Sequence, residues 1–437
     1  MYSYLSNLNY KKKIYLIYIV FILLIVSFSI IFTFFLINKG FGFIDKDLNI
    51  ILKEIPFNWG DLTHNINENF SFHSTMFEKE FYLKKFPLNA ILIVLIFKIS
   101  KNIYFFLIIK NILISSVIFS SVYFFSKKME LNFIHFLAVL ISFFLIPYNT
   151  IVIFHFVYAD HLTSFLLPLI FIFLISNLSL KYFFISLIIF VLYFTKPSIF
   201  FVCTIIPIVI IILEKKSLVK YLPLLFSLLA IITWGSYGFN KTGVFPFGKN
   251  LLSNNSYDFS AITNKKFVEI YPNQSVDSLV DSVDINFNQD YKLFEDEWDF
   301  YNYFNNRNQY YLTNNFSSYL RTIPLKIKFI FFGINKDGID SDEFEKTGIK
   351  IRYSNIFNKI ILNLAIIISL FLLFKNSKNF LQQKHELYYL SILSLNILPL
   401  IYAWATTKHL VGIFILSNLY LLIKIFSFFD IEKKKFN

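Results

Sequence analysis

The chain has 437 residues, of which 56% are hydrophobic and 20% aromatic, and its formal net charge is +13. A soluble domain seldom exceeds about half apolar residues, so this composition excludes an ordinary water-soluble protein and indicates one that crosses a membrane several times. In a soluble protein the charge would suggest a nucleic-acid partner; here we expect it to set membrane topology, with no nucleic acid involved. The single cysteine, Cys203, excludes an internal disulfide and a thiolate metal cluster.

Apolar runs long enough to cross a bilayer occur along the whole chain. The first, from Ile14 to Asn38, is too long for a cleaved signal peptide, so we interpret it as a retained anchor. We expect an all-α polytopic membrane bundle of about ten transmembrane helices. They are predicted over residues 14–38, 104–125, 133–154, 162–178, 183–195, 198–213, 221–238, 356–374, 387–404 and 410–429.

The lysines predict the direction of each crossing. If the short apolar stretch from Phe86 to Ser100 does not cross, nearly all lysine clusters near the predicted helix ends fall on one side, which the positive-inside rule makes cytoplasmic. Both termini are then cytoplasmic, and the Phe86 stretch is an interfacial or re-entrant helix within a first outer loop, residues 39–103. The clusters are Lys11–Lys13, Lys127–Lys128, Lys181, Lys215–Lys216 with Lys220, Lys375 with Lys378 and Lys384, and Lys433–Lys435.

The chain therefore divides into three parts. Residues 1–238 form an N-terminal membrane bundle, residues 239–355 an outer, periplasmic region, and residues 356–437 the C-terminal transmembrane helices. The outer region is polar and rich in Asn, Asp and Tyr, and we expect a mixed outer domain, a small α-rich or α/β cap packed near the first outer loop. Its acidic run FEDEWDF, from Phe294, is interpreted as a solvated face.

Glycine is concentrated at one point of the chain. Of its 11 glycines, four lie in TWGSYGFNKTGVFPFG, which starts at Thr233 where an apolar run stops. Either this is a flexible exit from the membrane, or the backbone passes close to another part of the molecule, which glycine permits because it has no Cβ.

Polar residues that stand out fall on the predicted outer side. Asp61 follows a glycine and opens a predicted helix, so an N-cap and a catalytic acid fit it equally well. Asp160 also fits a simple loop residue, and Lys196, before a proline, fits a lysine that snorkels to the interface. Lys408 and His409 fit an interfacial anchor. Taken together, a carboxylate near lysines at a membrane surface suggests chemistry on a charged lipid headgroup.

The order of these features resembles the GT-C superfamily of integral-membrane glycosyltransferases, especially bacterial relatives of protein O-mannosyltransferases and of the lipid A aminoarabinose transferase. The family's acidic residue that opens a helix in the first outer loop is matched by Asp61, and His64, three residues later, falls within the same motif. Its basic residue before a Pro-containing helix is matched by Lys84 or Lys85 in YLKKFPLNAILIV.

The resemblance continues along the chain. The acid of the second outer turn is matched by Asp160, the basic residue and proline that begin a later span by Lys196 and Pro197, and the Arg-Tyr of the last span by Lys408 and His409. TWGSYGFNKTGVFPFGKNLL resembles the stretch in which the family's chain leaves the bundle beside the active site, although the arginine of that motif is absent.

The resemblance implies transfer of a sugar from a polyprenyl-phosphate donor to a glycan, lipid or protein acceptor. The reaction takes place at the outer face of the bacterial cytoplasmic membrane, among membrane lipids, with inversion at the anomeric carbon. Asp61 is implied as the general base and Asp160 as the residue that positions the acceptor or a sugar hydroxyl. The implied substrate-binding residues are Lys84, Lys85, Lys196, His64, Lys408 and His409. Some members use a divalent metal, and two separated acids leave that requirement open here.

A flippase or transporter for a lipid-linked sugar is the alternative function. Transporters place charges near the bilayer midplane, in broken helices, often within internal repeats. The sequence has no visible repeat, and its unusual charges lie at one surface, which favours the enzyme.

Overall fold

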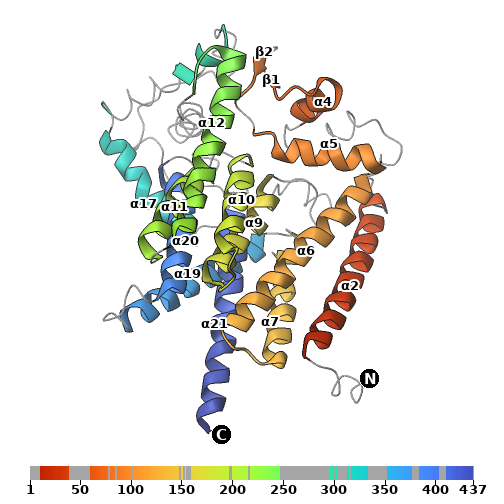
Figure 1. The fold of residues 1–437 in the computed structure, drawn as a ribbon, viewed down its shortest axis with the longest axis vertical. Helices are drawn as coiled ribbons and strands as arrows, with labels where there is room; N and C mark the ends of the chain where they lie inside the picture. The colour runs from red at the N-terminus through yellow and green to blue at the C-terminus, as the bar shows by residue number, and fades with distance from the viewer. Residues whose placement is uncertain are drawn as a thin grey trace.

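In a computed structural model, the chain is mostly helical (Figure 1). The structure describes residues 10–38, 60–76, 79–83, 86–100, 103–146, 149–150, 153, 159–195, 199–214, 217–246, 295–299, 301–302, 313, 316–332, 352–375, 383–402 and 410–436.

Every predicted transmembrane segment contains a helix. These helices are α2 (Tyr10–Asn38), α6 (Ile103–Lys128), α7 (Phe133–Leu145), α9 (Ala159–Ile175), α10 (Lys181–Tyr193), α11 (Phe200–Leu213), α12 (Leu222–Thr242), α19 (Arg352–Lys375), α20 (Lys384–Tyr402) and α21 (Val411–Phe436). Within the described ranges, five helices are long and apolar enough to cross a membrane: they lie in α2, α6, α12, α19 and α21. The structure is thus compatible with a multi-pass membrane protein.

The helix predicted over residues 133–154 is shorter than expected. α7 ends at Leu145, and Ile146 is extended, with φ −71° and ψ 112°. Residue 147 is proline, which disfavours the helical conformation of the residue before it. The prediction of an unbroken helix to Phe154 was therefore wrong, because it weighed hydrophobicity alone.

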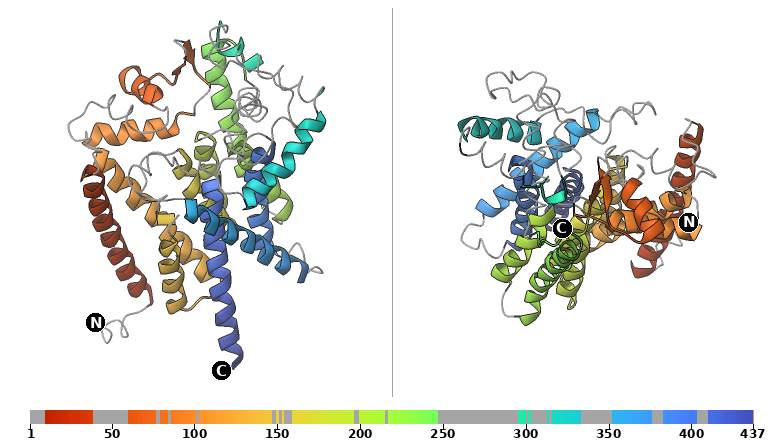
Figure 2. Two further views of the ribbon diagram at one scale, coloured as in Figure 1. Left: turned by 180° about the vertical axis from the view of Figure 1, so that it is seen from behind. Right: turned by 90° about the horizontal axis from the view of Figure 1, so that it is seen from above.

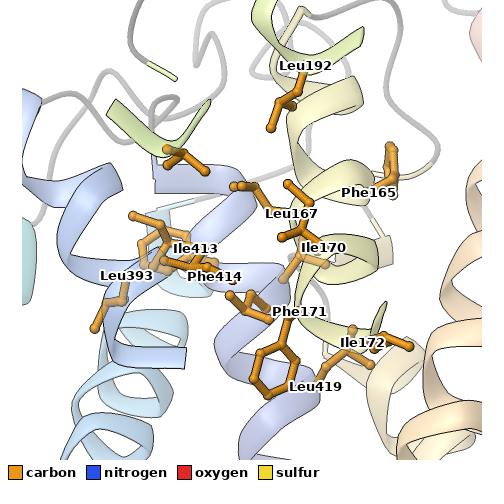
Figure 3. Packing of buried hydrophobic residues seen from close by; sticks show 14 of the residues in the cluster. Phe165, Leu167, Ile170, Phe171, Ile172, Leu192, Leu393, Ile413, Phe414 and Leu419 are labelled. Carbon is orange, nitrogen blue, oxygen red and sulfur yellow. The ribbon is translucent and has the colours of Figure 1, made fainter. Parts of the chain in front are cut away.

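The core lies where the middle helices cross. α9 contacts α10, α21, α6 and α20, and its Phe165, Ile170 and Phe171 are almost fully buried. Figure 3 shows Ile170 and Phe171 facing Ile413, Phe414 and Leu419 of α21, with Leu393 of α20 beyond the α21 side chains. By contrast, α2 has many exposed apolar side chains, including Leu23, Leu24 and Ile31, as expected of a helix that faces lipid.

Two helices of the first outer loop lie at one end of the bundle. α5 (Leu88–Ser100) runs across that end and not alongside α2 and α6 (Figure 1). α4 (Gly60–Asn69) packs on α5. This arrangement agrees with the prediction that the Phe86 stretch does not cross with the other helices.

Several of the lysines that were predicted to share one side gather at the opposite end. Glu214, which follows α11, accepts a hydrogen bond from Lys384 Nζ at 2.8 Å and lies 3.6 Å from Lys181 Nζ. Lys128 donates to Asn177 Oδ1 at 3.0 Å. The ends of α6, α9, α11 and the start of α20 therefore meet. The start of α2 and the end of α21 lie at this end too (Figure 2).

Acidification tests this ionic cluster. The pKa of Glu214 is below its ordinary value of 4.5: burial alone would raise it, but the Lys384 hydrogen bond, the Lys181 charge and the Tyr388 hydroxyl outweigh burial. The folded state therefore binds this proton more weakly than the unfolded state. The stabilisation is complete above the unfolded pKa and is lost as pH falls through the lower folded pKa.

We expect Glu214→Gln to lower the free energy of unfolding in detergent by about 1.5–3 kcal/mol at neutral pH, the range for a hydrogen bond to a charged group. The variant should also lose less stability than the parent as pH falls below 4.5, the ordinary value. Glu68→Gln, at an exposed position of α4, is the control. Thermal melting across pH measures both effects, and identical curves for Glu214→Gln and the parent would contradict the assignment.

Cysteine labelling tests the arrangement in the membrane. On a Cys203→Ser background, we expect Glu68→Cys to react with a membrane-impermeant maleimide in intact cells, and Lys127→Cys to react only after the membrane is opened. Both positions are exposed in the structure, so burial would not explain a failure to react. Labelling of position 127 in intact cells would reverse the predicted orientation.

The outer region, expected to be α-rich or α/β, contains a helix whose position was not predicted. α17 (Phe316–Phe332) packs against α19 and α20. Its Lys326 is 1% exposed and donates to the Ile401 carbonyl at 3.0 Å. In its described part, the outer region thus packs partly on bundle helices, in addition to the contact with the first outer loop described below.

Candidate functional site

The predicted catalytic acid lies at the start of a helix that is fixed by apolar contacts. α4 begins at Gly60, so Asp61 is its second residue. Leu62 and Ile66, one turn apart, are buried against Ala90 and Val94 of α5. A helix start favours negative charge, because its first N–H groups have no partner within the helix. The side chain of Asp61 is outside the described part of the structure.

His64 lies one turn after Asp61, on the same side of α4 by helical spacing. Its Nδ1 atom is buried and has no hydrogen-bond partner within the described residues. A buried polar atom without a partner costs free energy unless a ligand or water satisfies it. This atom is therefore a candidate contact for a substrate hydroxyl.

A short hairpin follows α4. Phe70 takes a positive φ of 51°, which ends the helix, and β1 (Ser74–Met76) then pairs antiparallel with β2 (Lys79–Phe81). Asn65 of α4 donates to the His73 carbonyl at 2.9 Å. The hairpin is thereby tied to the helix that carries Asp61.

A polar cluster lies beside the hairpin. Tyr82 donates its hydroxyl to Glu80, and this hydrogen bond is the main reason that the pKa of Tyr82 rises to about 12. His73 Nε2 lies 3.7 Å from Glu80 Oε1, and Lys241 Nζ lies 5.6 Å from the centre of the Tyr82 ring. Tyr82 therefore stays protonated at physiological pH and remains a hydrogen-bond donor.

The glycine-rich stretch continues α12 as a helix and does not form a loop at Gly235 or Gly238. A Cβ added at Gly238 would lie 2.8 Å from Leu83 Cδ2, and one added at Gly235 would lie 2.0 Å from Phe245 Cζ. Only Gly243, with φ 73°, ends the helix in a left-handed turn. Close approach is thus confirmed at two glycines and a turn at one; Gly248 is outside the described residues.

Aromatic side chains join α12 to the first outer loop. Trp234 and Tyr237 stack with ring centres 5.2 Å apart, and the Tyr237 hydroxyl donates to the Phe72 carbonyl at 3.0 Å. The ring centres of Phe86 and Trp234 are 5.0 Å apart. The exit of the chain from the bundle is therefore packed against the loop that carries Asp61.

Glu297 corrects the prediction of a solvated acidic face. It is 3% exposed and Trp298 is 8% exposed. Glu297 accepts the backbone N–H of Tyr82 at 2.7 Å, the N–H of Leu83 at 2.8 Å and the Tyr301 hydroxyl at 2.5 Å. Burial, followed by the charge of Glu297, raises the pKa of Tyr301 well above its ordinary range. A single sequence gives no signal that separates this acid from its solvated neighbours.

The predicted phosphate-binding lysines, Lys84, Lys85 and Lys196, are outside the described residues. The chain on either side of them is described, and those flanking segments meet. Leu88 donates its N–H to the Phe194 carbonyl at 3.3 Å.

Aromatic rings strengthen the same junction. The ring centres of Phe86 and Tyr193 are 5.6 Å apart, and those of Phe194 and Trp234 are 6.1 Å apart. Phe86 directly follows the first lysine pair, and Phe194 precedes the other lysine by two residues. The two predicted lysine segments thus converge beside α12.

The remaining predicted residues are less well defined. Asp160 lies at the start of α9, with its side chain outside the description, and Lys408 and His409 precede α21 in undescribed chain. The α21 helix then carries buried Asn418, whose amide donates to Asn149 at 2.6 Å and to Asn358 at 2.9 Å.

An apolar groove of about 460 Å³ lies between α2 and α7. Its walls come from one face of α2, including Phe21 and Phe28, and from α7, including Phe144. Thr150 also lines the groove, and its hydroxyl donates to the Phe144 carbonyl at 2.6 Å. The groove can hold a hydrocarbon chain, since almost nothing polar lines it.

In the described part of the chain, no three His, Cys, Asp or Glu side chains gather in a way that could hold a metal ion. Comparison of the chain with models of protein families, with curated proteins and with solved structures finds no match. The fold itself defines the class: a mostly helical protein with several helices that can span a membrane.

Proposed function

We propose that the protein is an integral-membrane glycosyltransferase. It moves a sugar from a polyprenyl-phosphate donor to a glycan, lipid or protein acceptor at the outer face of the bacterial cytoplasmic membrane. The observation that carries the proposal is the convergence of the chain around Lys84–Lys85 with the chain before Lys196, beside α12. Two cationic segments at one end of an apolar bundle suit a lipid phosphate, which charge-assisted hydrogen bonds bind strongly.

The position of Asp61 supports its role as the general base. α4 is held on α5, and α5 begins within two residues of Phe86, beside the lysine pair. In the proposed reaction the acceptor hydroxyl attacks the anomeric carbon as the bond to the phosphate oxygen breaks. Asp61 takes the hydroxyl proton, and polyprenyl phosphate leaves with the electron pair. The displacement inverts the anomeric carbon, while Asp160 and His64 position hydroxyl groups.

The donor's hydrocarbon tail suits the groove between α2 and α7. The groove is lined by side chains such as Phe21, Leu140 and Phe144. Moving hydrocarbon into it from water would be favourable by about 25 cal/mol per Å² of buried surface. Within lipid the gain is smaller, so the groove orients the tail and the headgroup contacts supply most of the affinity.

The proposed topology has ten crossings with both termini in the cytoplasm. The gathering of Lys128, Lys181, Glu214 and Lys384 at one end supports it, because the chain must cross the bundle between these turns. This end would be cytoplasmic by the positive-inside rule, and α4 and α5 would lie outside. Short helices such as α10, with 13 residues, would be about 20 Å long. They would cross by packing inside the bundle.

Cells that make the protein provide a test of the proposed acceptor classes. Membranes with and without it are supplied with polyprenyl-phosphate sugar bearing a radioactive sugar, and lipid, glycan and protein fractions are counted separately. Apart from the label that remains in the intact donor, we expect label in one of the three fractions only when the protein is present. Equal labelling of all fractions in both membranes would overturn the proposal.

A flippase is the second candidate, and buried polar groups favour it. Lys326 and Lys359 are 1% and 2% exposed, and Asn418 bonds two other buried asparagines, as in a path for a polar headgroup. Sealed liposomes separate the two functions: a flippase moves labelled lipid-linked sugar between leaflets without changing it, whereas a transferase releases polyprenyl phosphate.

A further inference from the structure

Glu297 has contacts that the reaction above does not use. Its two carboxylate oxygens accept the consecutive backbone N–H groups of Tyr82 and Leu83, at 2.7 and 2.8 Å. One of these oxygens also accepts the Tyr301 hydroxyl. A carboxylate that is 3% exposed is costly to bury unless donors such as these compensate it. The arrangement is therefore specific and not a chance surface contact.

Two consecutive amides bound to one carboxylate fix the orientation of the peptide between them. The Leu83 side chain is fully buried and packs against α12, with its Cδ2 atom 2.8 Å from where a Cβ on Gly238 would stand. Leu83 is thus held by Glu297 through its backbone N–H and by α12 through its side chain. The next two residues of the chain are Lys84 and Lys85.

We propose that Glu297 is a positioning residue, which holds the Tyr82–Leu83 backbone so that the lysine pair after it meets the donor phosphate. The inference rests on the proposed function in assigning that phosphate. It makes donor binding depend on an acid 215 residues further along the chain than Tyr82. The outer region would then act in donor binding without touching the donor.

Glu297→Gln is the main test, because glutamine keeps the shape but replaces one acceptor oxygen with an NH₂ group that cannot accept an amide N–H. Glu295→Gln, at an exposed position of the same segment, is the matched control. Glu297→Asp keeps the charge but is too short to reach both amides, and Tyr301→Phe keeps both amide contacts. These two variants keep the test available if Glu297→Gln fails to fold.

Two readouts separate positioning from mere stability. The first is binding of a fluorescent polyprenyl phosphate to purified protein. Its Kd should rise about 10-fold in Glu297→Gln, equal to the loss of about one hydrogen bond to a charged group, and stay unchanged in Glu295→Gln. The second is hydrogen exchange in a peptide containing Tyr82 and Leu83, which should quicken in Glu297→Gln and Glu297→Asp but little in Tyr301→Phe.

Parent-like Kd in well-folded Glu297→Gln or Glu297→Asp would overturn the inference, as would unchanged exchange at Leu83. A parent protein that binds polyprenyl phosphate but transfers no sugar would overturn the transferase and leave this inference supported by the Kd difference. A parent protein that does not bind polyprenyl phosphate would overturn both.

Discussion

Asp61→Asn should lower the rate of sugar transfer by about 10²–10⁴-fold, the usual effect of losing a general base. Asparagine has nearly the same shape and caps a helix as well as aspartate, so α4 should keep its packing on α5. The loss should appear in kcat, because the proton is removed only in the transition state. Steady-state rates at saturating donor measure it.

Glu68→Gln is the matched control for this substitution, since it removes a charge from an exposed position of the same helix. It should transfer at the parental rate. Both variants must first show the parental melting temperature. If Asp61 only caps the helix, Asp61→Asn will transfer normally, and the assignment of the base is then wrong.

Lys196→Ala should raise the apparent KM for the donor by about 10- to 100-fold, with a smaller change in kcat. Removing one charge-assisted hydrogen bond to phosphate costs about 1.5–3 kcal/mol, and this contact is made in the ground state as well as in the transition state. Transfer rates over a range of donor concentrations separate KM from kcat.

Lys98→Ala, at an exposed position in the last turn of α5, is the control for loss of one positive charge. A Lys196→Ala protein with parental KM would mean that Lys196 only anchors its helix at the interface. The convergence of its neighbours with the segment after Lys85 would then be structural.

Hydrophobicity alone predicted where helices occur. Each predicted crossing contains a helix, because long apolar runs have few other ways to satisfy their backbone groups in a membrane. It could not predict the end of α7 at Leu145, which depends on the local effect of the proline at residue 147. It also missed α17, whose sequence mixes apolar residues with Lys326 and Lys328.

The candidate site was predictable only in part. Close approach of the backbone was one of two explanations for the glycines, and Gly235 and Gly238 confirm it. The partner of Gly238, Leu83, could not be identified, because nothing in a single sequence pairs α12 with a loop more than a hundred residues earlier. Glu297 was missed for the same reason: its acidic neighbours made it look solvated, and its burial depends on backbone groups at Tyr82 and Leu83. Predictions for Asp61, Asp160 and the lysines remain predictions.

The central claim is sugar transfer from a lipid phosphate, and the purified protein tests it most directly. The parent and Asp61→Asn are incubated in detergent with polyprenyl-phosphate sugar labelled in the sugar, together with the acceptor fraction labelled in cells. The account predicts that the parent moves label to the acceptor with inverted anomeric configuration and releases polyprenyl phosphate, while Asp61→Asn does so at least about 100-fold more slowly. A folded parent protein that leaves the donor intact, or only moves it between leaflets in liposomes, would contradict the account.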